Sequence, residues 1–294
     1  METVKIGNIL IGKGMPVFII AEIGINHNGS LNTAKNLIDM AKRCGCDAVK
    51  FQKRTIEIVY TPEELAMPRE NPFGPTNGDL KRGLEFGQKE YKEIDRYCKQ
   101  KNIIWFASCW DEKSVDFIEQ FDPPCYKIAS ASLTDDGLLK HTCSKGKPII
   151  LSTGMSDMPM IEHAVKVLGK KNLIIMHCTS VYPAKIEEGD HGLSTINLRG
   201  IKILRDKFNV PVGFSSHDTG IMPTYAAAAM DACAVEKHIT LYKAMWGSDQ
   251  AVSIEPPELE KLCRIIRELE IAKGDGIIRI YEEEIPIMKK LRRK

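Results

Sequence analysis

The chain has 294 residues and a formal net charge of +2, and 43% of its residues are hydrophobic. This length suits one (β/α)8 barrel of ordinary size, and the charge gives no indication of a nucleic-acid-binding protein. No apolar run approaches the length of a membrane span, and the amino terminus lacks the apolar core of a signal peptide. We therefore expect a cytoplasmic protein whose nine scattered cysteines are reduced and mostly buried.

Apolar strands and amphipathic helices alternate along the chain, which is typical of parallel βα units. A short hairpin is predicted first, over residues 4–11. The predicted strands are 17–23, 48–52, 103–107, 125–129, 148–152, 173–177, 210–214 and 234–238. The predicted helices are 31–44, 89–101, 112–121, 135–145, 160–168, 195–208, 220–233 and 257–273. Eight of each favour a closed barrel over residues 1–273 with a basic, solvated tail at 274–294, and an open doubly wound sheet is the alternative.

One long stretch, residues 54–87, shows no regular pattern and contains four prolines and several glycines. A loop of this length is often functional. It follows the second strand, so it begins on the face of a barrel where ligands bind. We predict a lid over that face, with a passive insertion as the alternative.

Two histidines end neighbouring predicted strands at equivalent points. His217 follows strand 210–214, and His238 ends strand 234–238 after a helix of small residues. Ligands of barrels and parallel sheets bind at these strand ends, and two imidazoles there can hold a divalent transition metal. The alternative is a pair of unrelated surface histidines. A third histidine, His27, lies in a glycine-rich turn and either contacts substrate or caps the turn.

Lys50 and Lys127 lie inside apolar strands, where a lysine is costly to bury without a partner. Three serines lie at neighbouring strand ends, and with the lysines they would enclose one phosphate or carboxylate; they are Ser130, Ser152 and Ser215. Two alternatives remain. The lysines pair with Glu22 and Glu236 in a structural network, or one lysine is a Schiff-base nucleophile whose pKa is lowered by the other cation.

Eight motifs in order closely resemble the sialic acid synthase family over residues 17–273. They are AEIGINHNG, KFQ, YKIAS, LSTGM, MHCTSVYP, GFSSHDTG, EKHIT and GSDQAVSIEP. Members of that family condense phosphoenolpyruvate with an N-acetylated hexosamine to a nine-carbon 2-keto-3-deoxy sugar acid and release phosphate. The resemblance implies a metal-dependent enzyme of this type, acting on N-acetylmannosamine, its 6-phosphate or a related diacetamido sugar.

The resemblance also implies a role for each matching residue. Phosphoenolpyruvate would be bound by Lys50, Lys127, Ser130, Ser152 and Ser215. The metal, usually Mn²⁺ with Mg²⁺ or Co²⁺ as alternatives, would be held by His217 and His238. The sugar would face Glu22, Gln52, Tyr182 and Asp249, and Ser180 stands where bacterial members often have an asparagine. Glu236 would lie close to the reacting centre, and either it or Glu22 would orient or deprotonate a water molecule.

Many members continue into a small antifreeze-protein-like domain that lends an arginine to the partner's sugar site in a swapped dimer. We expect a short form without that domain, and a homodimer, where one forms, without domain swapping. The stretch 54–87 is the favoured source of a replacement cation, with Arg69, Lys81 and Arg82. The tail is the alternative source, with Arg279, Lys289, Lys290, Arg292 and Arg293. Two other functions stay open: a Schiff-base sugar-acid aldolase, and a barrel that binds a sugar phosphate without turnover.

Overall fold

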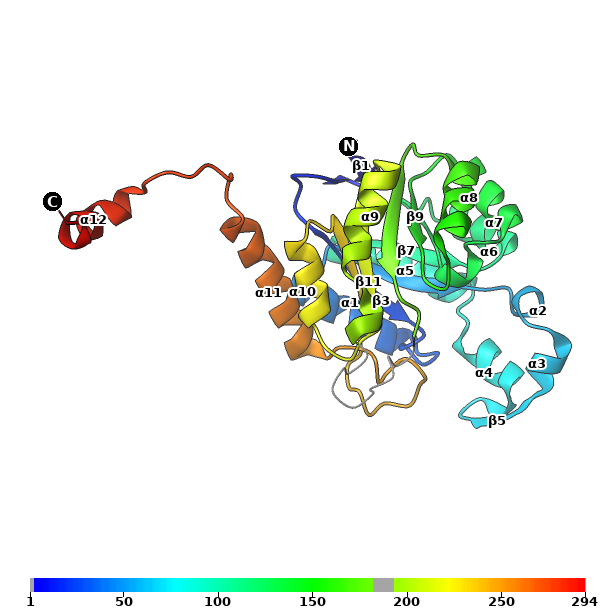
Figure 1. The fold of residues 1–294 in the computed structure, drawn as a ribbon. Helices are drawn as coiled ribbons and strands as arrows, with labels where there is room; N and C mark the ends of the chain where they lie inside the picture. The colour runs from blue at the N-terminus through cyan, green and yellow to red at the C-terminus, as the bar shows by residue number, and fades with distance from the viewer. Residues whose placement is uncertain (1–2, 182–192, 294) are drawn as a thin grey trace.

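The computed structural model describes residues 3–181 and 193–293, and its centre is a closed barrel of eight parallel strands (Figure 1). The strands follow one another around the barrel in chain order. They are β3 (Phe18–Gly24), β4 (Ala48–Lys53), β7 (Ile104–Cys109), β8 (Tyr126–Ile128), β9 (Ile149–Ser152), β10 (Leu173–Cys178), β11 (Val212–Ser216) and β12 (Ala234–His238). All eight predicted strands are confirmed, and the closed barrel is correct rather than the open sheet.

Eight helices pack around the barrel, and all eight were predicted. They are α1 (Leu31–Cys44), α5 (Gln88–Lys101), α6 (Glu112–Glu119), α7 (Asp136–Ser144), α8 (Met158–Leu168), α9 (Arg199–Phe208), α10 (Met222–Ala229) and α11 (Pro256–Ala272). The predicted bounds are wrong by more than two residues at two of them, α9 and α10. A separate 3-10 turn, Leu193–Ile196, precedes α9. α10 ends early because Asp231 adopts a left-handed conformation with φ of 67°, which a continuing helix does not allow.

The predicted hairpin is present and closes the amino-terminal end of the barrel. It consists of β1 (Val4–Ile6) and β2 (Ile9–Ile11). The side chains of Ile6 and Ile11 are fully buried and belong to the same apolar cluster as Phe18 and Ile174 from the barrel strands. A second, larger cluster lies between the strands and the helices. With this end filled by apolar side chains, polar groups can gather only at the carboxyl ends of the strands.

Residues 54–87 are folded, so the prediction of a stretch without regular structure is wrong. They contain α2 (Ile56–Val59), α3 (Pro62–Ala66), β5 (Pro68–Asn71), β6 (Gly74–Thr76) and α4 (Asn77–Leu84). Thr61 and Thr76 each begin a helix with a capping box, in which the threonine and an acidic residue three positions later satisfy each other's backbone N–H groups. We call this segment the insertion; Figure 1 shows it beside the barrel.

The insertion is attached to the barrel through aromatic contacts. The Phe73 ring meets the Trp246 ring edge-on, with centroids 6.4 Å apart. Phe73 also lies against Gly83, where an added Cβ would be 2.1 Å from the ring, so only glycine fits there. At the end of the insertion, Phe86 stacks on His27 with ring centroids 4.0 Å apart. The insertion therefore packs on the loops that follow β3 and β12.

His27 caps the turn after β3, since its Nδ1 accepts a hydrogen bond from the backbone N of Gly29 at 3.1 Å. Burial lowers its pKa to about 3, and a backbone contact with Gly24 opposes the shift only in part. The folded protein therefore keeps His27 neutral at a pH where the unfolded chain protonates it, and stability falls as the pH drops below about 6.5.

We expect this one histidine to contribute a loss of about 2 kcal/mol of unfolding free energy between pH 7 and pH 5. Urea unfolding at the two pH values measures it. In His27→Phe the ring stack can remain while the titrating group is gone, so the difference between the two pH values should shrink by that amount. An undiminished difference would show that other groups cause it. His163→Ala is the control, because the His163 side chain is 57% exposed.

The carboxyl-terminal segment extends away from the barrel (Figure 1). It carries a 3-10 turn at Glu282–Glu284 and the short helix α12 (Ile285–Leu291), and its described residues are largely exposed. Within residues 3–181 and 193–293, no helix has both the length and the apolar character needed to cross a bilayer. All nine cysteines are free thiols, and eight of them are buried.

Candidate active site

Four charged side chains from four strands meet inside the barrel near its carboxyl end. Lys50 Nζ lies 2.8 Å from Oε2 of Glu22 and 3.5 Å from Oε1 of Glu236. Lys127 Nζ lies 2.9 and 3.1 Å from the two carboxylate oxygens of Glu236. All four residues are buried. The pairing of each buried lysine with a glutamate, which was an alternative to the predicted anion site, is present, and we call these residues the ion-pair cluster.

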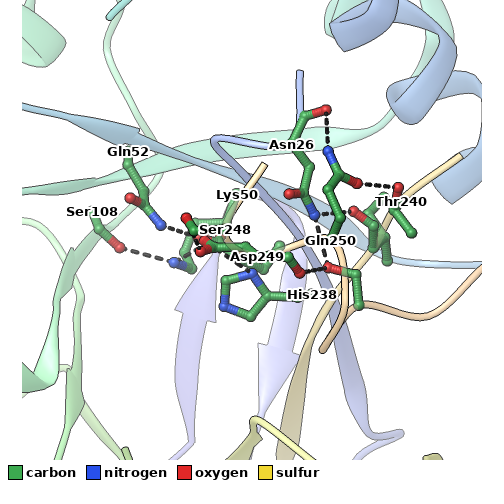
Figure 2. Close-up of polar contacts among 12 residues, drawn as sticks. Asn26, Lys50, Gln52, Ser108, His238, Thr240, Ser248, Asp249 and Gln250 are labelled. Carbon is green, nitrogen blue, oxygen red and sulfur yellow. Dashed lines mark hydrogen bonds and ion pairs between the residues drawn. The ribbon is translucent and has the colours of Figure 1, made fainter. Parts of the chain in front are cut away.

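Uncharged polar groups complete the surroundings of the ion-pair cluster (Figure 2). Lys50 Nζ donates to Ser108 Oγ at 2.9 Å, and Ser215 Oγ donates to Oε1 of Glu236 at 3.4 Å. Gln52 Nε2 donates to Oε1 of Glu22 at 2.8 Å. Gln52 and Ser215 were predicted at this site, and Ser108 was not. The pattern of strand ends could have indicated Ser108, since it lies near the end of β7.

The two glutamates of the ion-pair cluster have pKa values shifted in opposite directions. Burial raises the pKa of Glu22, and the neighbouring Lys50 opposes this shift without cancelling it. Burial would also raise the pKa of Glu236, but the ammonium groups of Lys127 and Lys50 outweigh it and lower that pKa to about 2. Burial lowers the pKa of Lys127, against the attraction of Glu236. Glu236 is thus the permanent counterion, and Glu22 is the carboxylate closer to exchanging a proton.

Ser130 and Ser180 meet around Gly154. The backbone N of Gly154 donates to Ser130 Oγ at 3.0 Å. A Cβ at Gly154 would be 2.8 Å from Ser130 Oγ and 2.1 Å from Ser180 Oγ, so the two hydroxyl groups need a glycine there. Ser152 is buried at the end of β9. Tyr182 lies outside the described residues.

The two predicted metal ligands lie next to each other, with ring centroids 5.5 Å apart. His217 Nδ1 is 3.0 Å from the backbone O of Thr179 and 3.6 Å from Cys178 Sγ. His238 Nδ1 is 3.8 Å from Oδ2 of Asp249. Burial lowers the pKa of His238, although Asp249 opposes this, and so favours the neutral imidazole that binds metals.

His217 and His238 offer two imidazole nitrogen donors to a metal bound between them. Within the described residues, no group of three or more His, Cys, Asp or Glu side chains is arranged to hold a metal ion. Two imidazoles from adjacent strands would still suit a divalent transition metal, with substrate or water as further ligands. The alternative of two unrelated surface histidines is wrong, because both side chains are buried and face each other.

A polar network fixes the loop that carries Asp249 (Figure 2). The hydroxyl of Ser253 donates to the backbone O of Asp249 at 2.6 Å, and Asn26 Nδ2 donates to that hydroxyl at 2.7 Å. Gln250 joins the network through Asn26 and Thr240. Asn26 and Gln250 were not predicted as site residues. Both lie within quoted motifs, but nothing in their spacing indicates that the two motifs touch.

The three insertion cations that were favoured for the sugar site contact other parts of the insertion. Arg69 donates to Asn77 at 3.3 Å. Lys81 lies over the Tyr60 ring, 4.8 Å from its centroid, and Arg82 Nε is 3.1 Å from Glu57. These cations are thus used to hold the insertion together.

Arg54, at the base of the insertion, contacts the predicted site residue Gln52. Its guanidinium donates to Oε1 of Gln52 and lies over the Trp110 ring, 4.2 Å from the centroid. Arg54 follows directly after β4, so its place at a strand end was a signal that sequence reasoning did not use. Lys237 was missed as well. It is a buried lysine in an apolar strand, which is the pattern that indicated Lys50 and Lys127.

The chain is similar to known proteins over most of its length. Residues 37–278 match the model of the NeuB family. N-acetylneuraminate-9-phosphate synthase of Homo sapiens is 37% identical over 286 residues, which are 96% of this chain and 78% of that protein. N,N'-diacetyllegionaminic acid synthase of Campylobacter jejuni is 38% identical over 274 residues, 90% of this chain and 80% of that protein.

One solved structure is similar to this chain over its whole length. The N-acetylneuraminic acid (sialic acid) synthetase from Leptospira borgpetersenii, crystallised with citrate, superimposes with a TM-score of 0.84 at 33% identity. The match covers 100% of this chain and 98% of that one. Together with the motifs and the closed barrel, these similarities show that the chain is a member of the NeuB family.

Proposed function

We propose that this protein condenses phosphoenolpyruvate with an N-acetylated amino sugar, yielding a nine-carbon 2-keto-3-deoxy sugar acid and inorganic phosphate. The observation that carries the proposal is the position of the ion-pair cluster directly beside the histidine pair. Glu236 and His238 project from the same strand into the barrel, and Glu236 contacts both Lys50 and Lys127. Charges suited to an anionic substrate and nitrogen donors suited to a metal thus lie close together inside the barrel.

The anion would be bound by exchange of partners within the ion-pair cluster. Two ammonium groups that now contact glutamates would turn toward the carboxylate and phosphate of phosphoenolpyruvate, since charge-assisted contacts to these groups are strong. Hydroxyl groups near the strand ends would complete the site. They belong to Ser130, Ser152, Ser180 and Ser215.

His217 and His238 would hold the metal, for which we propose Mn²⁺, with Mg²⁺ or Co²⁺ as alternatives. The carbonyl of Thr179 contacts Nδ1 of His217 and so would make Nε2 the ligand atom. When bound, the metal would supply a Lewis acid for the aldehyde oxygen of the open-chain sugar. Gln52 and Asp249 would orient that sugar, with Tyr182 as a further proposed contact.

The condensation joins C3 of phosphoenolpyruvate to the aldehyde carbon of the sugar. A water molecule then adds at C2, the bond from C2 to the phosphate oxygen breaks, and phosphate leaves. Glu22 would take the proton of that water, because its raised pKa suits a group that exchanges a proton. Glu236 would stay ionised beside the lysines. Holding both substrates side by side in the correct orientation would supply much of the acceleration.

The acceptor sugar is best identified by measuring phosphate release from phosphoenolpyruvate with a panel of amino sugars. The panel contains N-acetylmannosamine, its 6-phosphate and diacetamido hexosamines. We expect release of phosphate with at least one of them and none without a sugar. Absence of release with every sugar, in the presence of Mn²⁺, would contradict the proposal. The free, mostly buried cysteines support the cytoplasmic location that we propose with it.

A Schiff-base sugar-acid aldolase is the second candidate, because burial lowers the pKa of Lys127. The contact of Lys127 with both oxygens of Glu236 argues against a free amine. Borohydride reduction in the presence of pyruvate separates the two functions. A covalently labelled Lys127 would support the aldolase, and an unlabelled protein that releases phosphate would support the condensation.

Arg54 is the residue that we propose as the cation at the sugar end of the site. Its contact with Gln52 links it to Glu22, which we expect to face the sugar. Arg54→Ala should raise the KM for the sugar about 10-fold or more, because one charge-assisted contact is lost. The KM for phosphoenolpyruvate should change little.

The matched control is Arg69→Ala, which removes an insertion arginine whose guanidinium donates to Asn77. Steady-state rates with each substrate varied in turn measure both variants. If the sugar KM is unchanged in Arg54→Ala and raised in Arg69→Ala, Arg54 does not bind the sugar. The result would then support the cations of the insertion that the sequence predicted, Arg69, Lys81 and Arg82.

A further inference from the structure

A buried ion pair joins the two strands that carry the histidines. Lys237 lies between Glu236 and His238 in β12, and because side chains alternate along a strand it faces the helices while its neighbours face the barrel interior. Its side chain is 2% exposed. Its Nζ donates to Ser216 Oγ at 3.1 Å and lies 3.1 Å from Oδ1 of Asp218. It also donates to the backbone O of Asp218.

Ser216 and Asp218 are the residues on either side of His217. Ser216 is opposite Lys237 in the register of β11 and β12, and its hydroxyl donates to the Asp218 carboxylate. The other carboxylate oxygen accepts from the backbone N of Gly220 at 3.0 Å. One ammonium group, adjacent to His238 in the chain, therefore holds both neighbours of His217.

We propose that Lys237 and Asp218 are positioning residues that hold the His217 imidazole in its orientation beside His238. The inference rests on the proposed function, since the metal is part of that proposal. A buried ion pair stabilises a fold little more than apolar residues of the same size would. Fixing the orientation of metal ligands is a role that such a pair performs well, because ligands held by a second layer of contacts bind metals more tightly.

Binding of Mn²⁺ to the substrate-free protein tests the inference without any enzymatic reaction. The electron paramagnetic resonance signal of free Mn²⁺ gives the dissociation constant. Lys237→Met should weaken binding by roughly 10- to 100-fold, with the circular dichroism spectrum unchanged. Lys237→Arg should keep most of the affinity, since a guanidinium retains the charge and several donors. Adding Asp218→Asn to Lys237→Met should cost little more, because the two residues act as one unit.

Lys273→Met is the matched control. It breaks a pair of similar length, 2.9 Å from Asp231, on the surface of the same protein, and it should bind Mn²⁺ as the unaltered protein does. A folded Lys237→Met variant with unchanged affinity would overturn the inference. If Lys237→Met does not fold, Asp218→Asn decides in the same way.

The inference and the proposed function fail in different ways. Unaltered protein that binds no Mn²⁺, or binds it equally well after His217→Ala, would contradict the metal site itself. Mn²⁺ binding that is lost in His217→Ala but kept in Lys237→Met would leave the metal site standing and remove only the positioning role.

Discussion

Replacing Lys127 by methionine is expected to lower kcat/KM for phosphoenolpyruvate by about 10³-fold or more, because the substrate anion loses charge-assisted contacts in a buried site. The protein should also lose about 3–5 kcal/mol of unfolding free energy, since the buried Glu236 charge loses its closest partner. Initial rates with phosphoenolpyruvate varied, together with urea unfolding, measure the two effects. Lys50→Met should show the same kinetic effect.

A second substitution separates binding from stability. In Lys127→Met with Glu236→Gln the uncompensated charge is removed, so much of the lost stability should return while activity stays low. If Lys50→Met and Lys127→Met both keep the KM and kcat of the unaltered protein for phosphoenolpyruvate, the anion site is assigned wrongly. In that case the ion-pair cluster serves the fold alone.

His217→Ala should lower activity by about 10³-fold, since a Lewis acid contributes several kcal/mol to a barrier of this kind. In the unaltered protein, chelation should abolish activity and Mn²⁺ should restore it. In His217→Ala, added Mn²⁺ should restore little. The measurement is phosphate release before and after chelation, with metals added back one at a time.

His163→Ala is the control for this experiment, because His163 lies exposed on α8, away from the histidine pair. It should respond to chelation and to Mn²⁺ as the unaltered protein does. Full activity of His217→Ala after chelation would exclude the metal role of this residue. A metal response that His163→Ala also loses would point to a general loss of folding.

The barrel and the histidine pair could be predicted because both follow from local pattern. Alternation of apolar strands and amphipathic helices fixes the order of the strands, and a closed parallel barrel brings every strand end to one face. His217 and His238 end adjacent strands and therefore meet. Lys50 and Lys127 were recognisable because a lysine inside an apolar strand needs a partner.

The choice of that partner could not be predicted. Lys127 and Glu236 are 109 positions apart and lie on β8 and β12, which are not neighbours in the barrel. Their contact depends on the diameter of the barrel and on how far along its axis each side chain lies. The pattern of apolar and polar residues in a sequence gives neither quantity. The sequence therefore left both a phosphate site and a structural network open, and the structure shows that the same lysines form the network.

The insertion was mispredicted for a different physical reason. Its helices are short and mostly exposed, so they have little apolar periodicity, and they begin with capping boxes at Thr61 and Thr76. Arg54 lies two positions after the predicted strand end at 52 and directly after β4, but it was counted only as the first residue of the irregular stretch. Its contact with Gln52 depends on the direction of its side chain, which the sequence pattern does not give.

The hairpin formed by β1 and β2 closes one end of the barrel, so the interior faces solvent on the side of the carboxyl ends of the strands. Its isoleucines fill the far end with side chains that exclude water. In the proposed condensation, both substrates and both products would therefore pass the carboxyl ends of the strands. Each proposed turnover would therefore include release of both products on the side of the barrel by which the next substrates enter.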